Sequence, residues 1–370
     1  MKTNHFSGNL SFAAINRRKF LNHVTLGCTG LLATSSMFCI SPQAGKAVVS
    51  PACEFPWIRG TFTHVLNPPG IKHAREKNPR EQWYINDHCI FVDKTNLIHW
   101  FGITNPYPED GRYYAPGTHR HIGHASAKDP YGPWDEHPDS FSLPNDSKDG
   151  VGSCFVVHHG DDYFMLYDYS SNVKEGTNSA RSTGLHMAQS KDLFTWSSVE
   201  DFDVLLPAYG TRDPCVIKTK EGHYLLYVTG GNESVGIIFL GVSSDMLHWE
   251  WREPALITDQ TVGAGCLESP FVHFHNGVYY LFVNFSHRQY EETLIFTSSD
   301  PYHFDWQRPV CTLFAHAAEI FTWNGQDYIT HCGIEDRHWS DTGAPYGLWL
   351  AELDWAQSKK TQEEPQKSKK

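Results

Sequence analysis

The chain contains 370 residues and carries a formal net charge of −12 at pH 7. This acidic balance, without a basic stripe to neutralise phosphates, argues against a nucleic-acid partner. Only 19% of the residues are charged whereas 14% are aromatic. That combination favours a β-rich fold and suits sugar binding, because aromatic rings stack on the apolar faces of sugars.

Residues 1–47 are predicted to be a twin-arginine-type export signal. Arg17-Arg18 are followed by a mildly apolar stretch and by small residues at 44–47 that suit cleavage. An ordinary amphipathic helix and, because of Cys28, a lipoprotein signal are the alternatives. The apolar run is short and interrupted by Thr, Ser and Gly, so we expect a periplasmic or secreted protein without stable membrane insertion after signal cleavage.

The cysteines are predicted to be mostly free, buried thiols. Nine are present, of which Cys28 and Cys39 fall in the predicted signal, and the others show no paired CxxC spacing. Twin-arginine substrates generally fold in a reducing cytosol, which weakens the case for disulfides further. At the other end of the chain, residues 357–370 are polar and lack apolar periodicity, so they are predicted to be a disordered tail.

Between residues 55 and 355 the sequence repeats itself five times. Each repeat begins with a hairpin in which an apolar strand, a Gly-, Asp- or Asn-rich turn and an aromatic-rich strand follow one another; these hairpins start at Ile85, Val151, Thr211, Leu267 and His316. A second set of segments alternates with them, in which a strand ends in a Ser/Ala-x-Asp turn and a Trp follows. Two hairpins per repeat predict an all-β fold, one five-bladed β-propeller domain with four antiparallel strands per blade. A two-sheet sandwich is the alternative, but it does not explain a fivefold repeat.

The repeat also predicts where polar side chains converge. The innermost strands of a propeller surround a central channel and run the same way, so residues at equivalent positions lie near one mouth. When the hairpins are aligned by their turns, one residue of each falls near the beginning of its first strand. These residues are Asp87, Gly152, Asp213, Glu268 and Ala318 or its neighbours. Three of these are acids, and burying a lone carboxylate is costly unless it is paired or functional. The sequence therefore predicts a carboxylate cluster on the axis.

These residues resemble the motifs of five-bladed propeller glycoside hydrolases, those of families 43, 32, 62, 68 and 117. Asn86-Asp87, Arg212-Asp213-Pro214 and Glu268-Ser269-Pro270 match that pattern in order and approximate spacing, and the chain looks most like family 43. The resemblance implies that Asp87 is the base or nucleophile and Glu268 the general acid. It also implies that Asp213 modulates the acid's pKa and binds sugar hydroxyls, and that Arg212 orients one of these carboxylates or a substrate hydroxyl.

Further residues are candidates for contact with a substrate or a metal. His88 stands where family 43 more often shows Asp-Pro and family 32 shows Asn-Asp-Pro-Asn, which leaves the family open. No cofactor is expected to be required, but His316 lies where family 43 members often place a histidine facing a central cation, so a structural Ca²⁺ or Na⁺ in the channel is implied; a hydrogen-bonded core histidine is the alternative. In family 117 a histidine takes over the acid role, which makes His287 or His316 a further candidate. The predicted substrate-binding residues are Asn86, His88, Arg212, His287 and Trp83, the last by stacking on sugar.

The sequence thus predicts an exported glycoside hydrolase that acts on a furanoside or a short oligosaccharide from plant or algal polysaccharide. Single-step inversion is the preferred mechanism. The enzymatic alternatives are retention through a glycosyl-aspartate at Asp87, as in fructan-cleaving family 32, and a family 117-like hydrolase of algal galactan oligosaccharides. A propeller that binds carbohydrate without catalysis is the alternative of another class, although it would not need three carboxylates on its axis.

Overall fold

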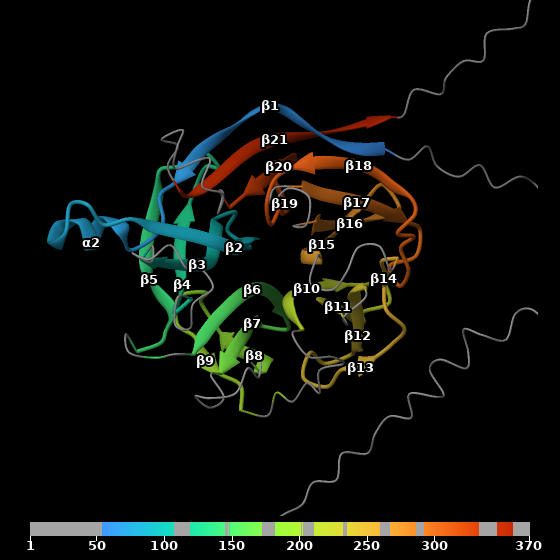
Figure 1. The fold of residues 1–370 in the computed structure, drawn as a ribbon, viewed down its shortest axis with the longest axis horizontal. Helices are drawn as coiled ribbons and strands as arrows, with labels where there is room; N and C mark the ends of the chain where they lie inside the picture. Colours follow the sequence, from blue (N-terminus) through green and yellow to red (C-terminus); the bar gives the residue numbers. More distant parts are fainter. Residues whose placement is uncertain are drawn as a thin grey trace, which may run out of the picture. The chain divides into compact units, whose positions relative to one another are not determined.

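The computed structural model describes residues 54–106, 119–144, 147, 149–171, 182–200, 202, 211–231, 235–259, 267–285, 292–332 and 346–357. The predicted export signal, and the predicted tail beyond its first residue, lie outside these ranges. Figure 1 shows five β-sheets around a central axis, which confirms the predicted propeller. In the described ranges the only helix is the short α2 (Ile71–Lys77), and no helix there has the length and apolar character of a membrane span.

Blades I to IV each follow the chain from the innermost to the outermost strand. Blade I consists of β2 (Trp83–Val92), β3 (Ile98–Pro106), β4 (His121–Ala127) and β5 (Trp134–Ser142). Blade II consists of β6 (Gly150–His159), β7 (Asp162–Ser171), β8 (Ser182–Ser190) and β9 (Ser197–Ser198). Blade III consists of β10 (Arg212–Lys218), β11 (Tyr224–Gly231), β12 (Gly236–Ser243) and β13 (Glu250–Trp251), with β14 (Leu256–Ile257) also paired to β12. Blade IV consists of β15 (Leu267–His275), β16 (Val278–Phe285), β17 (Glu292–Ser298) and β18 (Pro309–Phe314).

The fifth blade is completed by the strand that comes first in the propeller. It consists of β19 (Ile320–Trp323), β20 (Gln326–His331), β21 (Leu348–Gln357) and, outermost, β1 (Glu54–Leu66), which pairs antiparallel with β21. The repeat assigned four successive strands to every blade, and blade V differs from this expectation. Pairing the first strand with the last joins the two ends of the ring through backbone hydrogen bonds.

The Ser/Ala-x-Asp turns are local structures that shape the outer hairpins. In blade II, Asp192 Oδ1 accepts two backbone N–H bonds at 2.9 and 2.8 Å, and Asp245 does the same in blade III at 2.9 Å for both. The tryptophans that follow donate their indole N–H to a carbonyl inside the turn, Trp196 at 3.2 Å and Trp249 at 2.8 Å. These aspartates and tryptophans therefore stabilise the turns.

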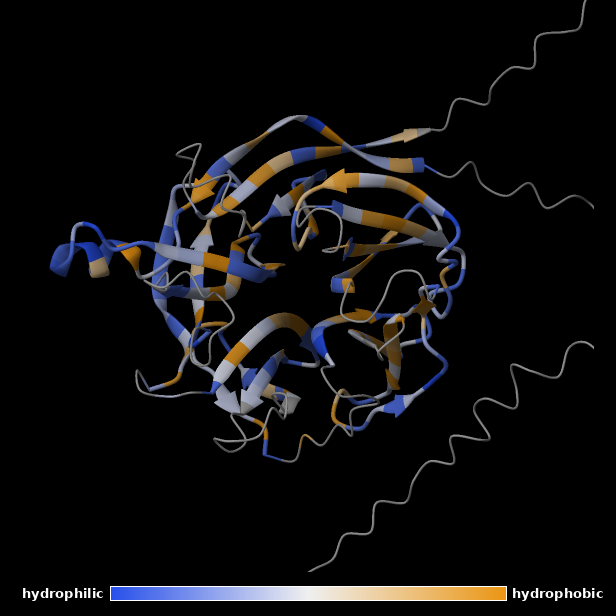
Figure 2. Cartoon of the chain, viewed as in Figure 1, coloured by the Kyte–Doolittle hydropathy of each residue, from blue (hydrophilic) through white to orange (hydrophobic). Residues whose placement is uncertain are grey.

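The apolar core lies between neighbouring blades. One cluster of buried side chains joins blades III, IV and V, and Figure 2 shows hydrophobic residues alternating with hydrophilic ones along many strands. The prediction of free thiols is confirmed for the described cysteines, which are Cys89, Cys154, Cys215, Cys311 and Cys332. All but Cys311 are buried, and two of them accept a backbone N–H from the next blade. The thiols thus serve as small core residues.

Blade I buries a pair of histidines, His99 on β3 and His124 on β4. The ring of His124 stacks 4.4 Å from that of Phe101, and its Nε2 lies 3.0 Å from Nδ1 of His99. Burial, with a smaller effect from neighbouring histidines, lowers the pKa of His124 to about 2. Burial likewise lowers the pKa of His99 to about 4. The folded chain therefore keeps both imidazoles neutral at pH values where the unfolded chain protonates them.

Replacing His124 by Phe is expected to make the protein less sensitive to acid. With a pKa of about 2 when folded and 6.5 when unfolded, His124 contributes a stability that is present above pH 6.5 and is lost as the pH falls toward 2. At pH 5 this loss is about 2 kcal/mol for one histidine. The difference in melting temperature between pH 7.5 and pH 5 should therefore be smaller in His124→Phe than in the wild type.

The comparison must be made between variant and wild type, because other buried groups act in the opposite direction. Burial raises the pKa of Asp168, Asp213 and Glu319, so their contribution to stability falls as the pH rises. The exposed His303 is the control: His303→Phe should keep the wild-type difference. An unchanged difference in His124→Phe would show that His124 does not govern acid sensitivity.

Candidate active site

The innermost strands of blades I to IV each contain a β-bulge. In every case two residues face a single residue of the second strand; the pairs are 86–87 in β2, 152–153 in β6, 213–214 in β10 and 269–270 in β15. A bulge bends its strand and leaves one residue outside the regular ladder. The repeated bulges therefore interrupt four inner strands at corresponding places.

The bulge residues line a pocket among the inner strands. It contains about 290 Å³ of empty space, part of it open to solvent. Its walls include Asp87, Ser153, Asp213 and Ser269 from the bulges and Glu319 from blade V. Burial raises the pKa of Glu319 well above its usual range, and Glu319 Oε2 accepts the Ile90 N–H at 2.8 Å. The pocket thus combines polar bulge residues with a buried acid that favours its neutral form.

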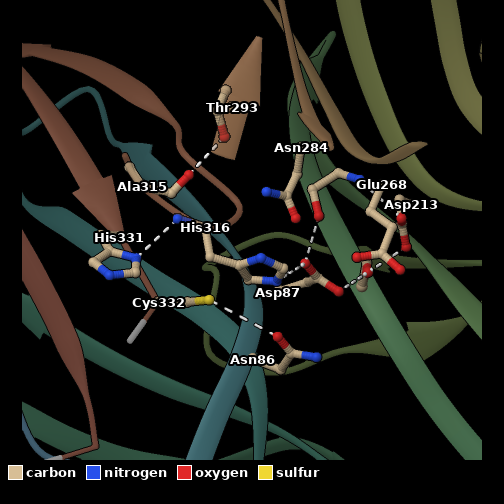
Figure 3. Close-up of polar contacts among 12 residues, drawn as sticks. Asn86, Asp87, Asp213, Glu268, Asn284, Thr293, Ala315, His316, His331 and Cys332 are labelled. Carbon is tan, nitrogen blue, oxygen red and sulfur yellow. Dashed lines mark hydrogen bonds and ion pairs between the residues drawn. The ribbon is translucent and has the colours of Figure 1, made fainter. Parts of the chain in front are cut away.

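The three predicted acids lie close together, although not in one register (Figure 3). Asp87 and Asp213 line the pocket, whereas Glu268 is not among its lining residues and lies next to Ser269, which is. Asp87 is the second bulge residue of β2, Asp213 is the first of β10, and Glu268 directly precedes the bulge of β15. Alignment by the turns had placed them in equivalent positions, which is wrong in detail: relative to the bulges the three acids occupy three successive positions. Asp213 and Ser269 share the first bulge position, and both have positive φ angles of 58° and 47°. Such backbone conformations cost about 1 kcal/mol or more and gather at functional sites.

Asp87 is held by a hydroxyl on each of its carboxylate oxygens. Ser153 Oγ donates to Asp87 Oδ2 at 2.9 Å, and Ser269 Oγ donates to Oδ1 at 2.6 Å. His316 Nε2 lies 3.9 Å from the same Oδ1. The two hydroxyl donors fix the orientation of the Asp87 carboxylate. The sequence analysis named Ser269 only as part of a motif, and it did not identify Ser153, which lies one position beyond Gly152, the residue aligned with the acids.

Ser153 also links Asp87 to Asp213, and this link requires an extra proton. Its Oγ lies 2.8 Å from Asp213 Oδ1 as well as 2.9 Å from Asp87 Oδ2. A hydroxyl has one proton, so two carboxylate oxygens at these distances are both satisfied only if one of them is protonated. Burial raises the pKa of Asp213, Arg212 opposes this, and the charge of Asp87 adds to it. Of the two carboxyl groups, Asp213 is the one whose burial favours the protonated form.

A fourth carboxyl group, Asp168, lies behind Asp213. It comes from β7 and is buried, and both of its oxygens accept the backbone N–H of Asp213, at 3.2 and 3.1 Å. Burial raises the pKa of Asp168 well above its usual range, and repulsion from Asp213 adds to this. Its side chain occupies the space beside Gly152, where a Cβ would lie 2.8 Å from Asp168 Cβ. Blade II therefore supplies its acid from the second strand, and the glycine at the aligned position makes room for it.

Arg212 joins Asp213 to Glu268. Its Nε lies 3.6 Å from Asp213 Oδ2, and its Nη2 donates to Glu268 Oε1 at 3.2 Å. Burial works against the charge of the guanidinium, but the neighbouring carboxylates outweigh this and raise the pKa of Arg212. The side chain of Glu268 is 24% exposed, against 4% for Asp213, so Glu268 is the more accessible of the two. The predicted role of Arg212 in orienting a carboxylate agrees with these contacts.

Two other predicted residues are buried beside the bulge in blade I. His88 lines the pocket, and its Nε2 lies 2.7 Å from Thr330 Oγ1 of blade V. Burial lowers the pKa of His88 to about 3, so the imidazole is neutral. The side chain of Asn86 is also buried, and its Oδ1 accepts a long bond from Cys332 Sγ at 3.8 Å. Both residues connect blade I to blade V, and contact of either with substrate stays a prediction.

His316 faces Asp87 (Figure 3). Its backbone N–H donates to His331 Nδ1 at 2.9 Å, and the ring is buried. The implied Ca²⁺ or Na⁺ beside His316 stays a prediction.

The remaining candidates lie away from the four carboxyl groups or outside the described residues. Trp83 begins β2 and packs against Gly70, where a Cβ would lie 2.5 Å from its ring, and its ring stacks 6.1 Å from that of His121. It is not among the residues that line the pocket, so its stacking on sugar stays a prediction. His287 lies outside the described residues.

Solved structures of related folds agree with this architecture. A family 32 β-fructofuranosidase of Bombyx mori has 17% identity and a TM-score of 0.57, over 77% of this chain and 66% of that one. A family 43 β-xylosidase/α-arabinofuranosidase from a compost microbial metagenome has 16% identity and a TM-score of 0.52, over 80% and 95%. Fructan 1-exohydrolase IIa of Cichorium intybus has 16% identity and a TM-score of 0.51, over 73% and 57%. The chain thus spans slightly less than two thirds of the Bombyx mori enzyme.

The family follows from a match at the level of the sequence. No protein with a curated description matches the chain. Residues 78–273 match the model of the glycosyl hydrolases family 32 N-terminal domain, and this range is more than half of the chain. It contains Asp87, Asp213 and Glu268, together with Arg212 and Ser153. The chain therefore belongs to family 32 of the glycosyl hydrolases, one of the propeller families that its motifs resemble.

Proposed function

We propose that this protein is a glycoside hydrolase that cleaves fructofuranoside bonds in oligosaccharides, with retention of configuration. The observation that carries the proposal is the orientation of Asp87 together with the exposure of Glu268. Asp87 is oriented by two hydroxyl donors, which suits a nucleophile, and Glu268 is partly exposed, which suits an acid that exchanges protons with substrate and water. The family 32 match supports retention over the inversion that the sequence analysis preferred.

The reaction would proceed in two steps. A carboxylate oxygen of Asp87 attacks the anomeric carbon while Glu268 gives its proton to the departing glycosidic oxygen. Glu268 then takes a proton from water, the resulting hydroxide attacks the same carbon, and the bond to Asp87 breaks to restore both residues. Asp213 would hydrogen-bond sugar hydroxyls, and Arg212 would hold Glu268 in place between the steps.

The substrate class rests on the relatives. The Bombyx mori β-fructofuranosidase has been solved with sucrose, and the chicory protein is a fructan exohydrolase, whereas the family 43 structures include a complex with xylotriose. Fructose-containing oligosaccharides are therefore the first candidates, ahead of arabinofuranosides, xylosides and agar fragments.

The test is hydrolysis of this panel by the purified chain, with the configuration of the first product followed by NMR or polarimetry. Release of fructose with retained configuration would support the proposal. Release of fructose with inverted configuration would overturn the two-step mechanism, and release of another sugar alone would overturn the substrate class. If no sugar is released but one of them binds in calorimetry, the protein is a carbohydrate-binding propeller instead.

We also propose that the protein is exported, a proposal supported by Arg17-Arg18 and the small residues at 44–47. Cell fractionation of a strain that expresses the full chain tests this. Export that stops when Arg17 and Arg18 are both replaced by Lys is the expected result, and cytosolic retention of the unaltered chain would contradict it.

Replacing Ser153 by Ala is expected to lower kcat/KM about tenfold and to shift the titration of Asp213 to higher pH. The variant removes one donor to Asp87, so the carboxylate is less firmly oriented. It also removes the hydrogen bond from Ser153 that lowers the pKa of Asp213, so this pKa should rise further. A loss of activity through disturbed packing alone would leave the titration of Asp213 unchanged.

Ser269→Ala is the matched control for this experiment. Its hydroxyl donates to Asp87 but does not bridge to Asp213, whose Oδ2 accepts the backbone N–H of Ser269 instead. Both variants should lower kcat/KM, and only Ser153→Ala should also change the titration of Asp213, which NMR of the carboxyl carbons can follow. Identical titration of Asp213 in the two variants would contradict the hydrogen bond from Ser153 to Asp213.

A further inference from the structure

A second cluster of ligating side chains lies at the seam between blades IV and V. His273 and His275 come from the end of β15, and Asp327 comes from β20. One ligand atom from each lies within 4.8 Å of the other two. Among the described residues this is the only such group of three. It is five or more residues along β15 from Glu268, which is about 16 Å in an extended strand, so it is separate from the active site.

The local sequence and the packing explain why these three side chains converge. Alternation along a strand places residues i and i+2 on one face, so both histidines of the H-x-H pair point to the same side of β15. Both rings stack on Trp355 of β21, with centroids 5.5 Å away for His273 and 3.9 Å for His275. The indole N–H of Trp355 donates to Asp327 Oδ2 at 2.7 Å. One tryptophan therefore orients all three side chains.

The chemistry of the group suits a transition metal. The ring of His273 stacks on those of His275 and Trp355, and its nitrogens make no hydrogen bond among the described residues. His275 Nε2 lies 3.0 Å from Glu54 Oε2, the kind of carboxylate–histidine pairing that accompanies metal-bound histidines. Asp327 and Glu54 supply two negative charges to balance a divalent cation.

We propose that His273, His275 and Asp327 form a zinc site that connects blade IV to blade V. Two imidazole nitrogens and one carboxylate oxygen are ligands that zinc accepts in tetrahedral geometry, with water as the fourth. The site lies beside β1, the strand that closes the ring, and Tyr280 of blade IV already donates its hydroxyl to the Glu54 carbonyl at 2.6 Å. A metal bridge at this seam would stabilise ring closure, because binding that occurs only in the folded chain stabilises it.

The experiment is zinc binding to the full chain without an affinity tag, after treatment with a chelator. We expect one zinc per chain by calorimetry and elemental analysis, with a higher melting temperature when zinc is added. His273→Gln and Asp327→Asn should each weaken binding at least tenfold and abolish the rise in melting temperature. Cobalt should give the visible absorption spectrum of a tetrahedral site in the wild type and not in the variants.

His159→Gln is the matched control, because His159 ends the inner strand of blade II as His275 ends that of blade IV, and its Nδ1 lies 2.7 Å from Tyr224 Oη. This variant should bind zinc like the wild type. Absence of saturable binding to the wild type would overturn the proposal, and so would binding that both His273→Gln and Asp327→Asn retain. Circular dichroism of the metal-free variants shows whether they fold, and if one does not, the other decides.

Discussion

Replacing Asp87 by Asn should lower kcat at least about a thousandfold on every substrate that the wild type cleaves. The amide keeps the size of the carboxylate and can still accept one hydrogen bond from Ser153 or Ser269. It has no negative charge with which to attack the anomeric carbon, so the first step of the reaction stops. Steady-state kinetics and binding calorimetry on the same substrate separate the loss of kcat from any loss of affinity, which should be small.

Two further measurements make this prediction specific to a nucleophile. Asp87→Ala leaves space beside the anomeric carbon, and added azide is expected to restore turnover there by forming a glycosyl azide. Asp300→Asn is the control, because Asp300 Oδ1 accepts the Tyr302 N–H in a turn of blade IV away from the pocket. More than a tenth of the wild-type kcat in Asp87→Asn would remove Asp87 from the chemistry.

Replacing Glu268 by Gln should have an effect that depends on the leaving group. A poor leaving group, such as the sugar of an unactivated oligosaccharide, needs a proton from Glu268, and kcat/KM should fall at least about a hundredfold. The acidic phenol of an activated aryl glycoside departs without that proton, so the rate of the first step should fall much less. Gln still accepts the bond from Arg212 Nη2, which keeps the side chain in place.

The comparison of the two substrates is the decisive readout for Glu268. An equal loss on both would mean that Glu268 supports the structure of the site rather than proton transfer, and no loss on either would exclude it from the mechanism. Glu250 provides the control, because it is exposed and forms an ion pair with Arg252. Glu250→Gln should leave both rates unchanged.

Much of the propeller follows from local sequence. The hairpins that begin near Ile85 and Val151 are recognisable because strand alternation and turn residues act over a few positions. The same holds for the Asp192 and Asp245 turns. The fivefold repeat and the motif order place Asp87, Asp213 and Glu268 in three blades, and the inner strands of a propeller must then bring them together.

Other features depend on residues that are far apart in the chain. β1 completes blade V across almost 300 positions, and no local pattern identifies its partner. The bulges appear only when two strands are paired, because a bulge is a mismatch between their registers. They set the three acids in successive positions rather than in one.

The same reason explains which residues of the site the sequence could not reveal. Nothing in the local sequence marks Ser153, whose hydroxyl contacts Asp87 and Asp213 from two other blades. Asp168 lies on the second strand of its blade and contacts Asp213 only in the folded chain. His273, His275 and Asp327 likewise meet only at the seam of two blades. The sequence by itself determined the repeat, the fold and the three acids, because these depend on local periodicity and on motifs. Only the tertiary structure decided their protonation, their partners and the second cluster, because burial and contact between distant segments control all three.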